Sequence, residues 1–336
     1  MKKRKKRGIF AVLTGLCLVT FCIGMCFGRY PVSLKELCMV LASRFTDIPV
    51  TWSKNTDNVV WAIRLPRMCG AFLVGAGLSI SGATYQGIFQ NPLVSPDLLG
   101  VSAGACVGAS IAILCGWPSA MIQLLALLGG LLAVALTNLI PILFRNKSNL
   151  MLVLAGIIVS GFFNSAQGLL KYVADPDTQL ALITFWTMGS LAKVDTASVL
   201  SVMPGMLISM GILLCLRWRI NLLAIGETEA HSLGVHITRL RGISILCATI
   251  LTASSICIAG TVGWIGLVVP HFGRLLVGSD NKKLMPASLL IGAAFLMLID
   301  TFARNLAGTE VPLSILTGFI GAPAFLILLV VQKSRV

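Results

Sequence analysis

The sequence predicts an all-α integral membrane protein with about ten transmembrane helices. Hydrophobic residues make up 57% of the 336 residues, whereas charged residues make up 11%. Soluble domains have about 45–50% apolar and about 25% charged residues, so this chain lacks the polar surface that water requires. Its apolar residues are gathered in runs of about 20, the length that crosses a bilayer core of about 30 Å. A soluble domain and an acidic disordered chain are both excluded.

Ten apolar stretches account for the predicted spans, two of them short. They are 8–28, 62–88, 97–115 (short), 119–144, 151–173, 196–216, 242–260, 262–277 (short), 284–303 and 312–332. The predicted organisation is a basic cytoplasmic tail over 1–7, the first span over 8–28, an extracytoplasmic loop over 29–60, a helical core over 61–332 and a cytoplasmic tail over 333–336. The polar loop over 29–60 is given no role.

The distribution of the basic residues predicts how the chain is oriented. The net charge is +14, and six of the 26 Lys and Arg residues lie within the first seven positions. With both termini in the cytoplasm, 17 basic residues fall inside and nine outside. An excess of Lys and Arg on the cytoplasmic side is the usual pattern, and such residues meet anionic lipid. No basic face carries interleaved aromatic residues, so nucleic acid is not an expected partner. We expect a multi-pass membrane protein with both termini in the cytoplasm.

The two halves of the chain share one layout. Spans 2–5 and spans 7–10 each comprise a long helix, a short helix near prolines and two long helices. The first set enters from outside and the second from inside, which predicts inverted repeats, an architecture typical of transporters. Within the first short span, Gly100, Gly104 and Gly108 are four residues apart. This spacing predicts a helix face that packs closely on a neighbour.

Catalytic and cofactor-binding patterns are absent from the sequence. It contains no P-loop, no H-E-x-x-H pattern and no G-x-S-x-G pattern. The ten cysteines and three histidines show no metal-ligand spacing. An ion-coupled carrier, the alternative class, should have ionisable groups deep in its spans, but these spans are nearly free of them. We therefore expect no enzyme, no metal and no bound cofactor, and an energy source on another polypeptide.

Three arginines lie at the predicted outer side, against the positive-inside tendency. They are Arg64 and Arg67 in the motif Arg-Leu-Pro-Arg, and Arg304 at the end of span 9. They can be membrane anchors, with Arg304 paired to Asp300 one helical turn away. They can also be a docking site for the carboxylates of an outside partner, because arginine pairs bidentately with carboxylates.

Two predicted cytoplasmic segments are also unusual. The stretch 90–100 contains Pro92 and Pro96, which break a helix and leave backbone groups unpaired. It can be a tight turn or a gate at the inner mouth of a pathway. The loop 217–241 places apolar residues among polar ones around Gly226 and Gly234, which predicts two short amphipathic helices covered by a partner such as a cytoplasmic ATPase.

Five motifs, in the same order along the chain, resemble those of one protein family. They are Arg64-Leu-Pro-Arg67, the stretch Asn91–Gly100 continued by Val-Ser-Ala-Gly, Phe185-Trp-Thr-Met-Gly189-Ser190-Leu, the stretch Gly263–Arg274 with Pro270 and His271, and the stretch Glu310–Pro323 with Pro312. Over residues 60 to 332 the chain resembles the FecCD (BtuC-like) permeases of type II ABC importers.

The resemblance implies a partner and a role for each segment. The permease would pair with a second copy or a close paralogue, with spans 5 and 10 lining a central pathway. Two cytoplasmic ATP-binding subunits would hold ATP and Mg, and an extracytoplasmic binding protein would deliver the cargo. The implied sites are docking through Arg64, Arg67 and Arg304; inner gates at Asn91, Pro92, Leu93 and Asn146; and ATPase coupling through Gly226, Glu227, Ala230, Leu233, Gly234 and Val235.

The same resemblance implies ATP-driven import of a large chelate. Residues 175–179 and 185–191 are more similar to iron(III)-siderophore permeases than to cobalamin permeases. An iron(III)-siderophore is therefore the expected cargo, with haem or cobalamin as the alternative.

Overall fold

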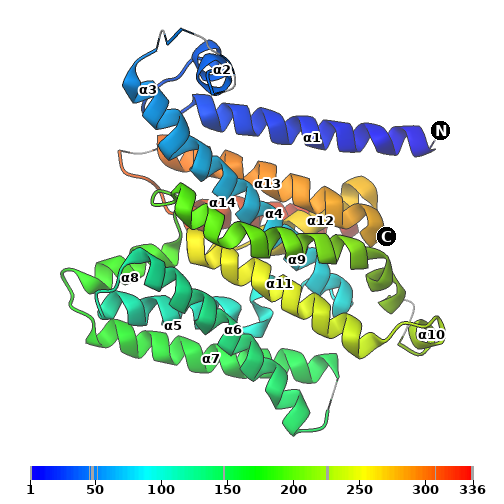
Figure 1. Ribbon diagram of the computed structural model, residues 1–336. Helices are drawn as coiled ribbons and strands as arrows, with labels where there is room; N and C mark the ends of the chain where they lie inside the picture. The colour runs from blue at the N-terminus through cyan, green and yellow to red at the C-terminus, as the bar shows by residue number, and fades with distance from the viewer. Residues whose placement is uncertain are drawn as a thin grey trace.

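The computed structural model describes residues 2–44, 46, 49–50, 52–146, 148–224, 227–306 and 308–333, and its regular elements are helices (Figure 1). In chain order they are α1 (Lys2–Cys26), α2 (Leu34–Ala42), α3 (Lys54–Asn58), the π-helix η1 (Val59–Arg64), α4 (Leu65–Ile88), the 3-10 helix η2 (Pro96–Leu99), α5 (Val101–Leu114), α6 (Ser119–Leu143), α7 (Asn149–Val173), α8 (Gln179–Met188), α9 (Thr196–Leu223), α10 (Glu227–Ser232), α11 (Ile237–Ala259), α12 (Ile265–Val277), α13 (Asn281–Asn305) and α14 (Leu313–Lys333).

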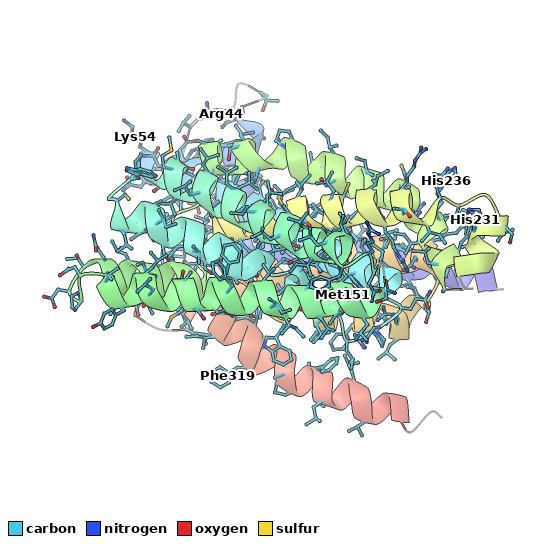
Figure 2. All side chains as sticks on the ribbon, turned by 90° about the horizontal axis from the view of Figure 1, so that it is seen from below. Arg44, Lys54, Met151, His231, His236 and Phe319 are labelled. Carbon is cyan, nitrogen blue, oxygen red and sulfur yellow. The ribbon has the colours of Figure 1, made fainter. Side chains whose placement is uncertain are left out.

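The long helices run roughly along one direction, so the molecule has two ends. Helices α2, α3 and α8 lie at the end that we call the outer end, and α10 lies at the inner end, following the orientation that the basic residues predict (Figure 1). Figure 2 shows Arg44 and Lys54 at the outer end and His231 and His236 at the inner end. The short helices and loops that carry the predicted sites are thus divided between the two ends.

Each of the ten predicted spans falls on a helix. Seven helical stretches of the described chain are long and apolar enough to cross a membrane, and the remaining three spans fall on α5, α12 and α14, of which the apolar stretches are shorter. An integral, multi-pass, all-α protein is therefore confirmed. The prediction missed α8, because its 10 residues measure only about 15 Å and do not form a span.

The segment predicted as a loop over 29–60 is partly helical. Helix α2 begins at a capping box in which the Glu36 amide donates to Ser33 Oγ at 3.2 Å and the Ser33 amide donates to Glu36 Oε2 at 3.0 Å. Helix α3 then continues through η1 directly into α4, so helical structure starts at Lys54 rather than near residue 62.

The centre of the bundle consists of α4, α11 and α13, whose side chains are mostly buried. Helices α4 and α13 approach closely at Gly75 and Gly292. A Cβ atom on Gly75 would lie 2.2 Å from the Gly292 carbonyl oxygen, so a side chain there cannot be accommodated without moving backbone.

Two of the three glycines that were predicted to form a packing face on α5 do so. A Cβ on Gly104 would lie 2.3 Å from the Gly129 carbonyl oxygen, and one on Gly108 would lie 2.0 Å from the Leu125 carbonyl oxygen, so both allow α5 to pack on α6. Gly100 is different, because it links η2 to α5 with φ of 80°. It is needed for its backbone conformation rather than for helix packing.

The helices repeat in length as the inverted layout predicts. Helices α4 to α7 have 24, 14, 25 and 25 residues, and α11 to α14 have 23, 13, 25 and 21. In both halves a stretch that is not α-helical, including η2 in the first, precedes the short helix. Helices α7 and α14 leave broad apolar faces uncovered by this chain, with Phe162 68% and Phe319 77% exposed (Figure 2).

Candidate functional site

The three outer arginines lie inside the protein rather than on its surface. Arg64, Arg67 and Arg304 are only 3%, 4% and 7% exposed. Arg67 donates from Nε and Nη2 to Asp300 at 2.9–3.0 Å, and Arg304 Nε lies 3.3 Å from the same carboxylate. Asp300 is fully buried between the two guanidinium groups, which compensate its charge. The local Asp300–Arg304 pair considered from the sequence is therefore present, and Arg67 joins it from α4.

Glu310, just before α14, completes this group of charges. Its Oε1 lies 2.8 Å from Arg67 Nη1 and its Oε2 lies 2.9 Å from Arg67 Nη2. Burial raises the pKa of Glu310, but the hydrogen bonds and charge of Arg67, with further charge from Arg304 and Arg29, outweigh burial. The net pKa is below its ordinary value, so the carboxylate stays ionised at neutral pH.

Arg64 and Arg304 also hold the outer end of α1. Arg64 Nη1 donates to the carbonyl oxygens of Met25 at 2.6 Å and Cys26 at 3.0 Å, and Arg304 Nη2 donates to that of Gly24 at 3.1 Å. The last carbonyl groups of a helix have no partners within it, and cations stabilise that end. In this structure Arg64 and Arg304 bind backbone carbonyl groups of α1. Docking of a binding protein through them remains a prediction.

At the inner end, the stretch 90–100 is an irregular turn held by several bonds. Gln90 has φ of 50° and donates from its side chain to the Leu223 carbonyl oxygen, where α9 ends. Asn91 Oδ1 accepts the Leu93 amide at 2.9 Å, and Leu93 is 56% exposed. The turn predicted at Asn91, Pro92 and Leu93 is thus present, and Gln90 connects it to the next inner segment.

Part of this turn packs against α7 away from the end of that helix. A Cβ on Gly156 would lie 2.1 Å from the Leu98 carbonyl oxygen, so η2 presses against α7. Gly156 is seven residues beyond the start of α7 at Asn149, which corresponds to about 10 Å. The other predicted gate residue, Asn146, is exposed in the loop before α7, where its Oδ1 accepts the Ser148 amide at 3.1 Å. Irregular backbone at this depth requires surrounding protein or a water-filled cavity.

The described residues of the predicted coupling loop contain one short helix, not two. Helix α9 extends to Leu223, and only α10 (Glu227–Ser232) forms before α11 begins, because the apolar residues on either side continue the long helices. The expectation that a partner covers every apolar residue is also wrong, since Leu223 and Ala230 are fully buried and Val235 is 7% exposed. Leu233 is 61% exposed. Gly226 lies outside the described residues, as does the side chain of Glu227.

Gly234 shapes the return from α10 to α11. It has φ of 80°, and its amide donates to the His231 carbonyl oxygen at 2.9 Å. A residue with a side chain would be strained in this left-handed conformation. The turn leaves Leu233 directed outward while Val235 is buried.

The remaining motif residues pack α12 against α14. Pro270 and His271 are buried, and the His271 ring lies edge-on to Phe325 at 5.2 Å between ring centres. His271 Nδ1 is 3.0 Å from the Leu267 carbonyl oxygen. Arg274 is partly buried near the inner end of α12, and Pro312 lies just before α14. No group of three potential metal ligands occurs in the part of the chain that the structure describes.

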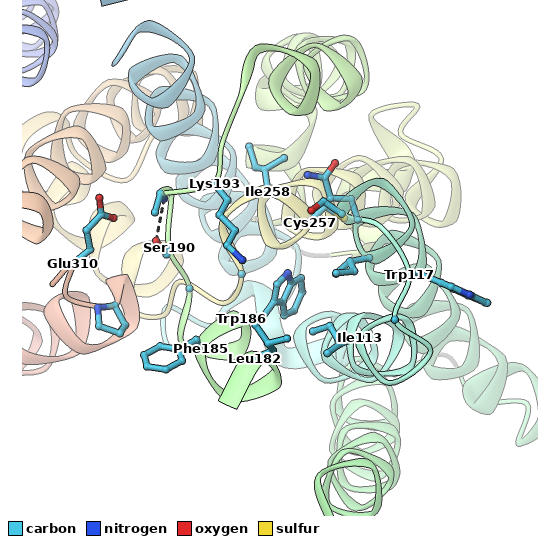
Figure 3. A pocket seen from close by; sticks show the side chains of 18 residues that line it. Ile113, Trp117, Leu182, Phe185, Trp186, Ser190, Lys193, Cys257, Ile258 and Glu310 are labelled. Carbon is cyan, nitrogen blue, oxygen red and sulfur yellow. Dashed lines mark hydrogen bonds between the residues drawn. The ribbon is translucent and has the colours of Figure 1, made fainter. Parts of the chain in front are cut away.

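A pocket of about 490 Å³ opens at the outer end and was not predicted (Figure 3). Its walls come from the α5–α6 turn, α8, residues 189–193, the end of α11 and the stretch before α14. The sequence gives a weak signal for it, namely Trp117 and Trp186 near the ends of apolar stretches, but nothing that brings them together. Glu310 links the pocket to the buried arginines.

Comparison with known proteins agrees with this architecture. Residues 16–331 match the FecCD transport family. The chain is 39% identical to the molybdate import system permease protein MolB of Haemophilus influenzae over 93% of this chain and 92% of that protein. It is 37% identical to the hemin transport system permease protein HmuU of Yersinia pestis, covering 84% and 88% of the two chains. It is 34% identical to the vitamin B12 import system permease protein BtuC of Klebsiella pneumoniae, covering 99% and 96%.

A solved structure shows the same fold. It is described as an inward-facing conformation of a metal-chelate type ABC transporter, and it superposes with a TM-score of 0.86 at 39% identity over 96% of this chain and 99% of that chain. The chain therefore belongs to the FecCD transport family, the permeases of ABC importers, which have no catalytic activity and bind no cofactor.

Proposed function

We propose that this permease translocates an iron(III)-siderophore-type chelate. An extracytoplasmic binding protein delivers the chelate to the outer end, and two cytoplasmic subunits bind and hydrolyse ATP. The named relatives carry molybdate, hemin or vitamin B12, so family membership alone leaves the cargo open. The siderophore assignment rests on the sequence of residues 175–179 and 185–191, and a pocket of about 490 Å³ at the outer end is large enough for a chelate.

The proposed coupling between the ATPase and the inner gate rests on the hydrogen bond from the Gln90 side chain to the Leu223 carbonyl oxygen. It joins the turn at the inner mouth to the end of α9, four residues before α10 begins. The Asn221 side chain donates to Asp280 Oδ1 at 2.7 Å and accepts the Asn281 amide at 2.8 Å, which ties the same end of α9 to α13. A force applied to α10 by an ATPase would thereby reach the turn and its gate residues.

The pathway itself forms between two permease subunits in this proposal. Helices α7 and α14 expose apolar side chains along their length, including Ile158 and Leu326 at 63% and 64%. A second copy or a close paralogue facing these helices would enclose a channel, with lipid covering the rest of the bundle. Leu93 and Asn146, both exposed at the inner end, would close that channel when no cargo is present.

Docking of the binding protein through Arg64, Arg67 and Arg304 requires an exchange of partners. Arg67 already pairs with two carboxylates of this chain, and the Glu310 side chain is the more exposed of the two, at 31%. A carboxylate of the binding protein would therefore replace Glu310 on Arg67, while Asp300 remains buried in place.

Transport by the reconstituted complex tests the function. The permease, its ATP-binding subunits and its binding protein are placed in liposomes, and accumulation of an iron(III)-siderophore, hemin, cobalamin and molybdate is measured. We expect accumulation of the iron(III) chelate alone, and only with hydrolysable ATP. Accumulation of one of the other three instead would show that the cargo is assigned wrongly, and accumulation without ATP would contradict the mechanism. A complex with a hydrolysis-deficient ATPase subunit is the matched control.

A further inference from the structure

The outer pocket has the composition of a ligand site rather than of a packing defect. Its volume of about 490 Å³ lies within the range of about 300 to 1,000 Å³ found for small-molecule sites. Most of its wall is apolar, with a small number of polar groups that face the same space. Figure 3 shows these side chains arranged around the opening between α8 and the α5–α6 turn.

Three of the lining residues are aromatic. Trp117, Phe185 and Trp186 all line the pocket, and Trp117 and Phe185 are 46% and 66% exposed. Trp117 stands on the α5–α6 turn, whereas the other two belong to α8. In Figure 3 the Trp186 ring lies beside the Lys193 side chain, and the Phe185 and Trp117 rings point away from it on opposite sides. Aromatic faces stack on flat rings and attract cations.

Lys193 supplies a positive charge to this space. Its side chain extends into the pocket toward Trp186 (Figure 3). The acidic residue in the wall is Glu310, and both of its oxygens are occupied by Arg67 at 2.8 and 2.9 Å. Within the described residues, no carboxylate lies within 4.0 Å of the Lys193 ammonium group. Lys193 is therefore available for an anion from outside the chain.

Polar groups beside Lys193 can add hydrogen bonds to such an anion. Ser190 Oγ accepts the Ala192 amide at 3.0 Å, which leaves its hydroxyl proton for another acceptor. Gln123 also lines the pocket, although its amide nitrogen donates to Ser198 Oγ at 3.1 Å. Lys193 and Ser190 each offer a donor that suits the oxygen atoms of an anionic ligand.

We infer that the outer pocket binds an anionic metal chelate with aromatic rings, of the catecholate class, before the chelate enters the channel between subunits. A ring of the chelate would lie against Trp186, and the oxygen atoms would face Lys193. A tetrahedral oxyanion would leave most of the volume empty and would make no use of the Trp186 ring. This inference rests on the proposed function, because it refines the cargo of that transporter.

Direct binding to the full-length permease in lipid nanodiscs tests the inference. The ligand is the radioactive gallium(III) complex of a tricatecholate, which matches the iron(III) complex in charge and shape and is redox-inert. We expect saturable binding that Lys193→Ala weakens about tenfold, the loss of one ionic hydrogen bond, and that Lys193→Arg retains. Trp186→Ala should weaken it as well. Lys35→Ala, at an exposed outer lysine away from the pocket, is the matched control.

The results separate this inference from the proposed function. Unchanged binding in both Lys193→Ala and Trp186→Ala, or displacement of the gallium complex by molybdate at equal concentration, would overturn the pocket assignment. If the permease binds no tricatecholate complex but the full importer accumulates iron(III)-siderophore, the pocket inference fails and the proposed function stands. If binding depends on Lys193 but the importer accumulates only hemin, cobalamin or molybdate, the proposed cargo fails and the pocket is not a station on the import route.

Discussion

Arg67 and Glu310 face each other in a two-pronged ion pair, with Nη1 to Oε1 at 2.8 Å and Nη2 to Oε2 at 2.9 Å. The pair joins α4 to the stretch that leads into α14, across 243 residues of sequence. Asp300 binds the remaining side of the same guanidinium group. The outer end is thus held by one arginine shared between two carboxylates of different exposure, and the two should respond differently to mutation.

Asp300→Asn should destabilise the protein strongly. Asp300 is fully buried and compensates Arg67 and Arg304, so its loss leaves Arg304 without a carboxylate and Arg67 with Glu310 alone, at about 3 to 5 kcal/mol. Thermal unfolding in detergent, followed by size-exclusion chromatography, measures the change. Glu310→Gln should cost clearly less, because Glu310 is partly exposed. Asp177→Asn, at an exposed outer residue, is the control, and equal effects of all three variants would contradict the assignment.

Acidification should weaken the Arg67–Glu310 pair only below the ordinary pKa of a glutamate. The pKa of Glu310 is lowered in the folded protein, so its contribution is fully present above the unfolded-state value of about 4.3. That contribution is lost as the pH falls through the lowered folded-state pKa. The difference in melting temperature between the parent and Glu310→Gln should therefore be constant near neutral pH and shrink in this acidic range. A difference that shrinks between pH 8 and 6 would be inconsistent with this.

Glu310→Gln should also strengthen docking of the binding protein. The substitution removes the carboxylate that competes for Arg67, so an incoming carboxylate meets less competition. Surface plasmon resonance with immobilised permease should show tighter binding at low salt, with the gain reduced at high salt because ionic contacts are screened. Asp177→Asn should leave the affinity unchanged. Weaker docking by Glu310→Gln would mean that Glu310 itself takes part in the interface.

Leu233→Asp should reduce capture of the ATP-binding subunit without unfolding the permease. Leu233 is 61% exposed beside α10, whereas its neighbours Ala230 and Val235 are buried. A charge at this position would face an apolar surface of the partner and should lower co-purification several-fold. Val50→Asp, at a 72% exposed residue of the outer end, serves as the matched control. Undiminished capture by Leu233→Asp would remove α10 from the proposed interface.

Gly75→Ala should prevent normal assembly of the bundle. Its Cβ would lie 2.2 Å from the Gly292 carbonyl oxygen, so α4 and α13 would have to separate. We expect loss of the monodisperse peak in size-exclusion chromatography. Gly161→Ala is the matched control, because nothing lies within 4 Å of its Cβ and alanine favours a helix by up to about 1 kcal/mol. A normal peak for Gly75→Ala would show that the two helices do not depend on this contact.

The spans could be predicted from the sequence because apolar length and helix-breaking residues are local signals. Span 4, predicted over 119–144, corresponds to α6 over Ser119–Leu143. Helix α8 could not be predicted in the same way, because its 10 residues are too few to cross a membrane. Helix α9 extends past the predicted end at 216 to Leu223, since Arg217 and Arg219 mark the membrane surface and not the end of a helix.

The sites were predicted less well because their partners are distant in sequence. Asp300 lies one turn before Arg304, so that pair was foreseeable, but Arg67 approaches it from 233 residues away. The outer pocket combines five separate segments, none with a recognisable pattern. The role of the arginines at α1 was missed for the same reason, since their acceptors are backbone carbonyl groups that carry no sequence signal.

Helix α1 lies at the edge of the bundle, where a removable membrane anchor would be expected (Figure 1). Its last carbonyl groups are nevertheless the acceptors for Arg64 and Arg304. Truncation at residue 28 would remove the Met25 and Cys26 acceptors of Arg64 and the Gly24 acceptor of Arg304, both of which are buried arginines. Shortened versions for crystallisation or display should therefore keep this helix whole, and affinity tags belong before Lys2 rather than in its place.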